Sequence, residues 1–92
     1  MAKSFRIRTK KKSNRTLDIE LFGDFDASSA CELIQVLDES TDQATKLAID
    51  TDGLRNINAF GLDVFLPRLS NLAASWPDIE ITGRFSSAFQ EQ

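Results

Sequence analysis

The chain has 92 residues, of which 41% are hydrophobic and 27% charged, which is an ordinary globular composition with room for one modest core. No apolar run approaches the roughly 20 residues that cross a bilayer, and the first residues lack the apolar segment of a signal peptide. Cys31 is the only cysteine, so no internal disulfide can form. We therefore expect a single domain over residues 1–92, without a transmembrane segment, in a reducing, cytoplasmic setting.

Charge is divided unevenly along the chain. Residues 1–15 carry seven basic side chains and no acidic one, whereas residues 16–92 carry four basic and fourteen acidic ones, so a charge of +7 is followed by −10. A basic segment can attract nucleic acid or an anionic membrane surface, but lysines also keep a solvated strand from pairing at its edge. Because the rest of the chain repels a polyanion, we expect no nucleic-acid binding.

The beginning of the chain has the pattern of an antiparallel hairpin. Apolar and polar residues alternate over residues 5–9 and again over residues 17–22, and a polar turn at residues 10–15 separates the two runs. Gly23 is expected to end the second strand.

A helix is expected next. Asp26 and Ser28 are possible N-caps, because a short side-chain oxygen can accept a bond from the open N–H groups of a first turn, and Ser29 with Glu32 fits a capping box. Cys31 lies on the apolar stripe, so we expect it to be buried in the core. The stripe consists of Ala27, Ala30, Cys31, Ile34 and Leu37.

The second half of the chain repeats the alternation of strand and helix. Residues 46–50 predict a short strand closed by a turn at residues 51–53, and residues 79–82 predict a fourth strand. Pro67 predicts a kink or a separate first turn in the intervening helix, and Pro77 predicts its end. Residues 84–92 predict a short helix or a frayed tail. The apolar face of the long helix consists of Leu62, Phe65, Leu66, Leu69, Leu72, Ala73 and Trp76.

The element order is therefore β-β-α-β-α-β-(α). Strands separated by helices imply right-handed crossovers and neighbouring parallel strands. This order predicts an α/β fold, in which a four-stranded mixed sheet carries its helices mainly on one face.

The residues that usually carry catalysis are scarce. There is no histidine and no tyrosine, which removes the usual base at neutral pH, and Cys31 therefore has no histidine partner. The four glycines form no phosphate-cradling loop. Four carboxylates at expected strand ends could hold Mg²⁺, although caps and turns explain them equally well. These are Asp24, Asp26, Asp50 and Asp52. We expect no enzyme activity, no metal and no cofactor.

Two segments resemble the STAS domains of bacterial anti-sigma factor antagonists. LFGDFDASSACELIQVL, residues 21–37, resembles the L-x-G-x-x-D opening of that family, and KLAIDTDGLRNINAFGLDVF, residues 46–65, resembles its second block. The resemblance covers nearly the whole chain and implies a mixed sheet with helices and a protein-binding module. The partner it implies is an anti-sigma-type kinase domain, or a signalling or transporter subunit such as those of lipid-transport ABC systems.

The resemblance also implies a phosphorylation site that this chain has lost. In antagonists like these, a kinase modifies the first serine of I-D-S-S-G-L, and here the matching residues 57–62 read INAFGL. Ala59 and Phe60 replace the serines, so neither position can accept a phosphate, whereas Asn58 remains a competent N-cap.

A docking surface is predicted around this turn. It consists of Asp24, Phe25, Asp26, Asn58, Ala59, Phe60, Gly61, Leu62 and Asp63. Phe60 is expected either to be an exposed anchor for a partner or to fold back onto the core, and the sequence leaves both open. Two further hypotheses stay open: a binder of anionic polymers or membrane surfaces through Arg6, Arg8 and residues 10–12, and a homo-oligomer or subunit of a larger assembly.

Overall fold

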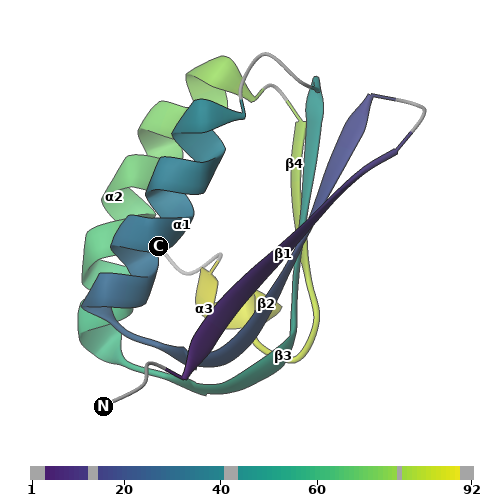
Figure 1. Ribbon diagram of the computed structural model, residues 1–92. Helices are drawn as coiled ribbons and strands as arrows, with labels where there is room; N and C mark the ends of the chain where they lie inside the picture. Colours follow the sequence, from purple (N-terminus) through teal and green to yellow (C-terminus); the bar gives the residue numbers. More distant parts are fainter. Residues whose placement is uncertain (1–3, 13–14, 41–43, 77, 90–92) are drawn as a thin grey trace.

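A computed structural model describes residues 4–12, 15–40, 44–76 and 78–89 (Figure 1). Its elements follow the predicted order. They are β1 (Phe5–Lys11), β2 (Thr16–Phe25), α1 (Ala27–Glu39), β3 (Lys46–Ile57), α2 (Ala59–Ser75), β4 (Asp78–Thr82) and α3 (Ser86–Phe89).

The strands form one mixed sheet in the order β1-β2-β3-β4. β1 runs antiparallel to β2, as the predicted hairpin requires, and the pairs β2–β3 and β3–β4 are parallel. Figure 1 shows α1 and α2 side by side over one face of this sheet, and none of the described helices covers the other face. The predicted α/β fold, with a four-stranded mixed sheet and helices on one face, is confirmed.

The core lies between the sheet and the two long helices. Three phenylalanine rings from β2, α2 and α3 meet edge to face there: Phe25 and Phe89 have ring centroids 5.0 Å apart, and Phe65 lies 5.7 Å from Phe89. Such edge-to-face pairs contribute about 0.5–1.5 kcal/mol beyond the burial of their area. The segment after β4 is thus a short helix that inserts Phe89 into the core.

β3 is much longer than predicted, and the expected turn at residues 51–53 is wrong. The register between β2 and β3 advances from Glu20 opposite Asp50 to Phe22 opposite Gly53, so β3 carries an extra residue there, and a second irregularity follows near Asp24. A bulge of this kind bends a strand without ending it. Gly53 accommodates the bend, because a Cβ atom there would lie 2.4 Å from Cδ1 of the Phe22 ring.

β2 also runs past its expected end. Gly23 does not terminate the strand; it adopts φ +94° within it, and β2 continues to Phe25. A side chain at Gly23 would collide with the backbone carbonyl of Ser4, which is why glycine is required there. Both strands therefore extend to one end of the sheet, where α1 and α2 begin.

The prediction of Asp26 as an N-cap of α1 is confirmed, whereas Ser28 and Ser29 lie inside the helix. Asp26 is the N-cap, and its Oδ1 accepts the backbone N–H of Ser29 at 2.8 Å. The prediction that Cys31 is buried is wrong, because its side chain is exposed. Cys31 lies about 100° around the helix from Ala30, outside the stripe that faces the sheet. The buried residues of α1 are Ser29, Ala30, Leu33, Ile34 and Leu37.

Pro67 does not separate the first turn of α2, as had been one expectation. The helix runs without interruption from Ala59 to Ser75 and contains Pro67, which is exposed. Pro77, the expected helix terminator, lies outside the described residues, and α2 ends at the C-cap Trp76.

Candidate functional site

The turn from β3 into α2 is held by Asn58. This residue has extended backbone angles, φ −93° and ψ 137°, and its side-chain oxygen accepts the backbone N–H of Phe60 at 2.8 Å. The carbonyl oxygen of Asn58 then accepts the N–H of Gly61 at 2.9 Å. The predicted N-cap is confirmed, and it places Ala59 and Phe60 as the first two residues of α2.

Phe60 points into solvent. Its side chain is 70% exposed, and no other large hydrophobic side chain is exposed among the residues that the structure describes. The two possibilities left open by the sequence are thereby separated: Phe60 does not fold back onto the core. The helix geometry explains this, since Phe60 lies about 200° around the axis from Leu62, which packs against the core.

Two residues of the predicted docking surface are buried. Phe25 is 1% exposed, and its ring contacts Phe5, Phe65 and Phe89 in the core. Gly61 is buried against the start of α1. The expectation that these two residues present themselves to a partner is therefore wrong, and they support the surface from beneath. Phe25 ends β2 with an inward side chain, because it continues the alternation of inward positions along that strand.

The structure does bring the segments 24–26 and 58–63 together. The N–H of Asn58 donates to the carbonyl oxygen of Phe25 at 2.8 Å, and this bond joins the ends of β3 and β2. Asp24 forms an ion pair with Arg55, with Nη2 and Oδ2 3.3 Å apart. Arg55 was not among the predicted site residues, although it belongs to the same strand end.

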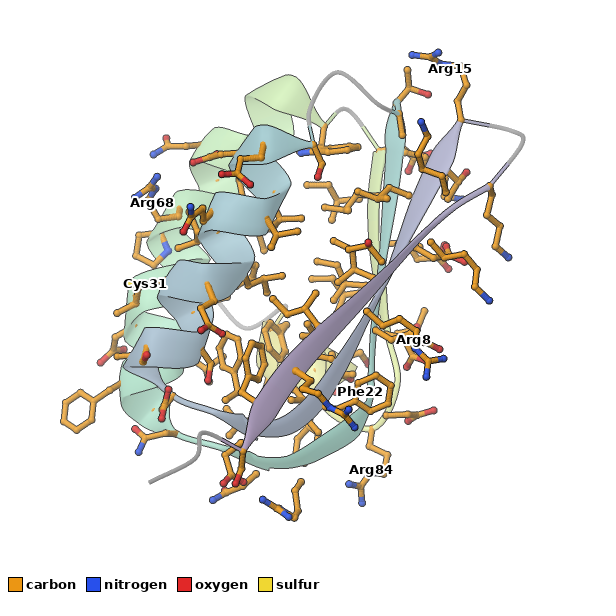
Figure 2. The ribbon with its side chains drawn as sticks, in the orientation of Figure 1. Arg8, Arg15, Phe22, Cys31, Arg68 and Arg84 are labelled. Atoms are coloured by element: carbon orange, nitrogen blue, oxygen red, sulfur yellow. The ribbon has the colours of Figure 1, made fainter. Side chains whose placement is uncertain are left out.

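A groove between α1 and α2 extends this surface, and sequence reasoning missed it. It has a volume of about 350 Å³ and is lined by Cys31, Ile34, Gln35, Asp38, Glu39, Val64 and Arg68. Val64 lies one helical turn after Phe60, so the groove and the exposed ring share one side of α2. Figure 2 shows Cys31 and Arg68 at the side of the two helices that faces away from the sheet. No pattern in the sequence indicates this groove, because most of its lining residues come from α1 and the groove forms only where α1 packs beside α2.

We call the exposed residues at the start of α2 the Phe60 surface. It consists of Asn58, Ala59, Phe60, Asp63 and the half-buried Val64. On this surface the exposed aromatic side chain of Phe60 lies near the polar side chains of Asn58 and Asp63. Such a surface suits the docking of a partner protein and contains no reactive group.

The four carboxylates that could have bound Mg²⁺ have structural roles. Asp24 pairs with Arg55, and Asp26 caps α1. Asp50 accepts the N–H of Asp52, and Asp52 accepts the N–H of Arg84 at 2.8 Å. Within residues 4–12, 15–40, 44–76 and 78–89, no group of three or more His, Cys, Asp or Glu residues is arranged to hold a metal ion.

The sheet order, the position of the two helices and the β3–α2 turn define the class of fold, which is that of a STAS domain. No family model matches the sequence, and no curated protein matches it. In the described part of the chain, no helix has the length and hydrophobicity that crossing a membrane requires.

Solved structures show which particular proteins share the fold. An anti-sigma factor antagonist from Mycobacterium paratuberculosis superposes with a TM-score of 0.69 at 16% identity, over 88% of this chain and 68% of that one. The STAS domain of an anti-sigma factor antagonist from Rhodobacter sphaeroides gives a TM-score of 0.64 at 12% identity, over 86% of each chain. The anti-sigma factor antagonist SpoIIAA in its unphosphorylated form gives 0.57 at 20% identity, over 75% of this chain.

This chain covers part of the length of some of these proteins. The chain spans 64% of SpoIIAA, and it spans 19% of a further structure, Mglu, which superposes on 84% of this chain with a TM-score of 0.71 at 13% identity. At these identities the likeness establishes the fold.

Proposed function

We propose that this chain is a non-catalytic protein-binding module of the anti-sigma factor antagonist type, which docks a partner protein on the Phe60 surface. The observation that carries the proposal is the exposure of Phe60, at 70% of its side chain, at the first turn of α2. The fold neighbours from Mycobacterium paratuberculosis and Rhodobacter sphaeroides are anti-sigma factor antagonists, and this supports a role in partner binding.

Burial of Phe60 is the expected source of affinity. Transferring such a side chain from water into an apolar pocket contributes about 1.5–3 kcal/mol, and aromatic residues at the centre of an interface commonly dominate its energy. The ring needs a partner with an apolar pocket. The groove beside Val64 offers a second apolar contact along the same side of α2.

The surroundings of Phe60 define the rim of such an interface. Asp63 is exposed one turn later, and Asp24 with Arg55 lies at the neighbouring strand end. Polar and charged groups at a rim contribute to specificity and to the rate of association more than to affinity. These three residues should therefore affect which partner binds and how fast it binds more than how tightly.

Docking on this surface is proposed to be independent of phosphorylation at residue 59. Ala59 has no hydroxyl group, so no phosphate ester can form at the position where the resemblance places the modified serine. A phosphate there would add about −1.5 to −2 charges to the contact surface. The partner proposed first is an anti-sigma-type kinase domain, and a signalling or lipid-transport complex is the alternative.

The basic hairpin is a weaker basis for a function. Arg8 pairs with Glu20 at 3.4 Å and Lys12 pairs with Asp18 at 3.2 Å, so acidic residues of β2 balance part of its charge. Figure 2 shows Phe22 beside Arg8, whose guanidinium lies 5.7 Å from the ring centroid, so one aromatic ring does lie among these basic residues. The alternative function is the binding of anionic polymers or membrane surfaces through this hairpin. Failure of the protein to bind DNA or anionic vesicles at low salt excludes it.

Affinity capture from lysate of the native cell tests the proposal. We expect Phe60→Asp to lose the proteins that the wild type captures, because a charge replaces the ring that the partner would bury, and Phe60→Leu to retain them. Thr45→Asp is the matched control: Thr45 is exposed and precedes β3, whereas Phe60 follows its far end. Retention of the same proteins by Phe60→Asp, with its fold intact by circular dichroism, would refute the proposed surface.

A further inference from the structure

The sheet has a free edge along β1. Within the described residues β1 pairs only with β2, and the register of this pair is unbroken from Phe5 to Lys11. A free edge presents unpaired backbone N–H and C=O groups to other chains. β1 is therefore a regular strand with one side open to a further strand.

The hydrogen bonds between β1 and β2 identify the backbone groups that face this edge. At one end of the pair, the N–H of Lys12 donates to the carbonyl oxygen of Thr16 at 2.8 Å. At the other end, the N–H of Asp24 donates to the carbonyl oxygen of Ser4 at 2.8 Å. Because residues that bond to the partner strand alternate with residues that do not in an antiparallel pair, the even-numbered residues of β1 bond to β2. The residues whose N–H and C=O groups point to the free edge, where no described residue bonds to them, are Phe5, Ile7, Thr9 and Lys11.

A groove lies beside β1 on the side of the sheet that carries the helices. It has a volume of about 670 Å³ and is lined by Ile7, Thr9, Lys11, Leu17, Val36, Glu39 and Ser40. Ile7 of β1 and Val36 of α1 are only half-buried, so the groove leaves apolar surface uncovered. A strand added to β1 extends the sheet beneath α1, and every second side chain of that strand faces this groove.

The other side of β1 is basic. The side chains of Arg6, Arg8 and Lys10 alternate with those that line the groove, so they lie on the opposite face of the sheet, and all three are exposed. Arg6 and Lys10 form no ion pair with any residue in the described part of the chain. Arg8 forms an exposed pair with Glu20 at 3.4 Å, and exposed pairs of this kind contribute little and can be exchanged.

We propose that β1 binds an extended segment of a partner protein in which acidic and apolar residues alternate. The segment adds to the sheet as an antiparallel strand, and its backbone bonds to the outward N–H and C=O groups of Ile7 and Thr9. Its apolar side chains lie opposite these two residues and enter the groove. Its acidic side chains lie opposite Arg6, Arg8 and Lys10. A shift of one residue would exchange the two faces, so the alternation specifies the register.

This geometry brings the opposite charges close together. Because Ile7 and Thr9 form the hydrogen-bonded pairs with the added strand, the basic residues lie in the other pairs, in which Cα atoms are about 4.5 Å apart and side chains are closer. Opposite charges that face each other directly stabilise a ladder. The basic residues of β1 are Arg6, Arg8 and Lys10 on this face.

The same features favour an acidic strand over other occupants. Basic residues on an edge ordinarily keep strands from pairing, so β1 repels a second copy of β1 and attracts a strand of opposite charge. A nucleic acid or an anionic membrane surface meets the same positive charge. Neither supplies a peptide backbone for Ile7 and Thr9, or alternating apolar side chains for the groove.

Fluorescence anisotropy of a labelled peptide tests the proposal with the full chain. The probe has blocked ends and consists of four glutamates that alternate with three valines, so it can lie opposite residues 6–12. We expect half-saturation below about 1 mM at low salt, and weaker binding at about 1 M salt, where the Debye length is about 3 Å. A control peptide with the three valines together should bind about tenfold more weakly or less, because it cannot present one apolar and one acidic side.

Thr9→Pro tests the backbone ladder. Proline removes the N–H of residue 9, which faces the free edge and not β2, so β1 should keep its place in the sheet. The affinity for the alternating peptide should fall by about tenfold, because the peptide carbonyl loses its donor. Thr9→Ala keeps the N–H and is the matched control, which should bind like the wild type. Arg6→Gln with Lys10→Gln tests the charged side, and binding to this variant should be weaker and depend less on salt.

Amide NMR signals of the wild type locate the peptide whether or not Thr9→Pro folds, and the signals of Ile7 and Thr9 should shift. The proposal is overturned if the alternating peptide does not bind, if these signals do not shift, or if Thr9→Pro, folded by circular dichroism, binds as tightly as the wild type. Equal binding of the two peptides also overturns it, because charge alone would then attract polyanions. Phe60→Asp should bind the peptide like the wild type, since Phe60 lies in the first turn of α2 and the groove lies at the last residues of α1. Failure of this proposal is therefore distinguishable from failure of the proposed docking function.

Discussion

Gly61 lies directly against the backbone of Asp26, so the first turn of α2 contacts the N-cap of α1. A Cβ atom on Gly61 would be 2.9 Å from both the carbonyl carbon and the carbonyl oxygen of Asp26. Because the obstacle is backbone, no change of side-chain rotamer can relieve it. The close approach of Gly61 to Asp26 fixes the position of segment 58–63 relative to segment 24–26.

Gly61→Ala should therefore destabilise the fold. Overpacking costs about 1–3 kcal/mol, and the better helix propensity of alanine returns about 1 kcal/mol, so we expect a net loss of up to about 2 kcal/mol. Urea unfolding followed by the fluorescence of Trp76, the only tryptophan and fully buried, measures the free energy of unfolding. Ala59→Ser, at an exposed position two residues earlier, is the control. An unchanged midpoint for Gly61→Ala would show that the two helix starts are not tightly held.

Hydrophobic patterning predicted the regular parts of this fold well. The alternation over Leu17, Ile19 and Leu21 predicted a strand whose inward side chains are buried, and all three are at most 2% exposed. The long helix after β3 was predicted by its apolar face, and Phe65 and Leu72 of that face are buried. Periodicity succeeds where one face of an element is covered along its whole length.

Patterning failed where tertiary contacts override local signals. Thr51-Asp52-Gly53 has the composition of a turn, yet it continues β3 because Gly53 pairs with Phe22 of β2, and the hydroxyl of Thr51 also donates to the carbonyl oxygen of Thr82 at 2.7 Å. No local pattern reveals a partner 31 residues away. The prediction that Cys31 is buried failed for another reason. Cys31 is small and apolar, but it lies at the margin of the apolar stripe of α1, where residue type alone does not decide burial.

The same contacts make Thr51 a sharp test of the bulged strand. Thr51 is fully buried, and its Oγ1 also accepts the N–H of Phe85 at 3.1 Å, so it links β3 to the segment before α3. Thr51→Val removes the hydroxyl and leaves both partners without their bond, which should cost about 1–3 kcal/mol. Thr51→Ser keeps the hydroxyl and loses one methyl group, so it should cost about 0.8 kcal/mol. Equal losses in urea unfolding would mean that packing, and not the hydrogen bonds, holds the bulge.

The candidate site was predictable in position but not in detail. The order of strand, cap and helix located the turn at Asn58, and the angle between Phe60 and Leu62 favoured an exposed ring without deciding between the two possibilities. The inward direction of Phe25 was missed because Gly23 was expected to end the second strand, whereas β2 continues to Phe25 and keeps its alternation of faces. The groove of Cys31 and Val64 depends on how two helices pack, which one sequence does not specify.

A negative charge at residue 59 should separate binding from stability. Ala59 is exposed at the first position of α2, and this helix has no acidic residue in its first turn. Ala59→Asp should therefore raise the free energy of unfolding by about 0.3–1 kcal/mol, because a carboxylate interacts favourably with the open N–H groups of a helix start. The same charge lies beside Phe60, so partner binding on the Phe60 surface should weaken by roughly tenfold or more, which corresponds to about 1.4 kcal/mol.

Urea unfolding and titration against the captured partner measure the two effects on the same variant, with Ala59→Asn as the uncharged control of similar size. The free energy of unfolding should rise while the affinity for the partner falls. This distinguishes a direct effect on binding from misfolding, because a misfolded variant would lose stability as well. Unweakened binding of a stabilised Ala59→Asp would place residue 59 outside the contact area. Ala59→Ser adds the hydroxyl that phosphorylation needs, and it should bind like the wild type until it is modified. If a kinase partner phosphorylates this serine, binding should then fall as it does for Ala59→Asp, which would restore control at a position where the native chain has none.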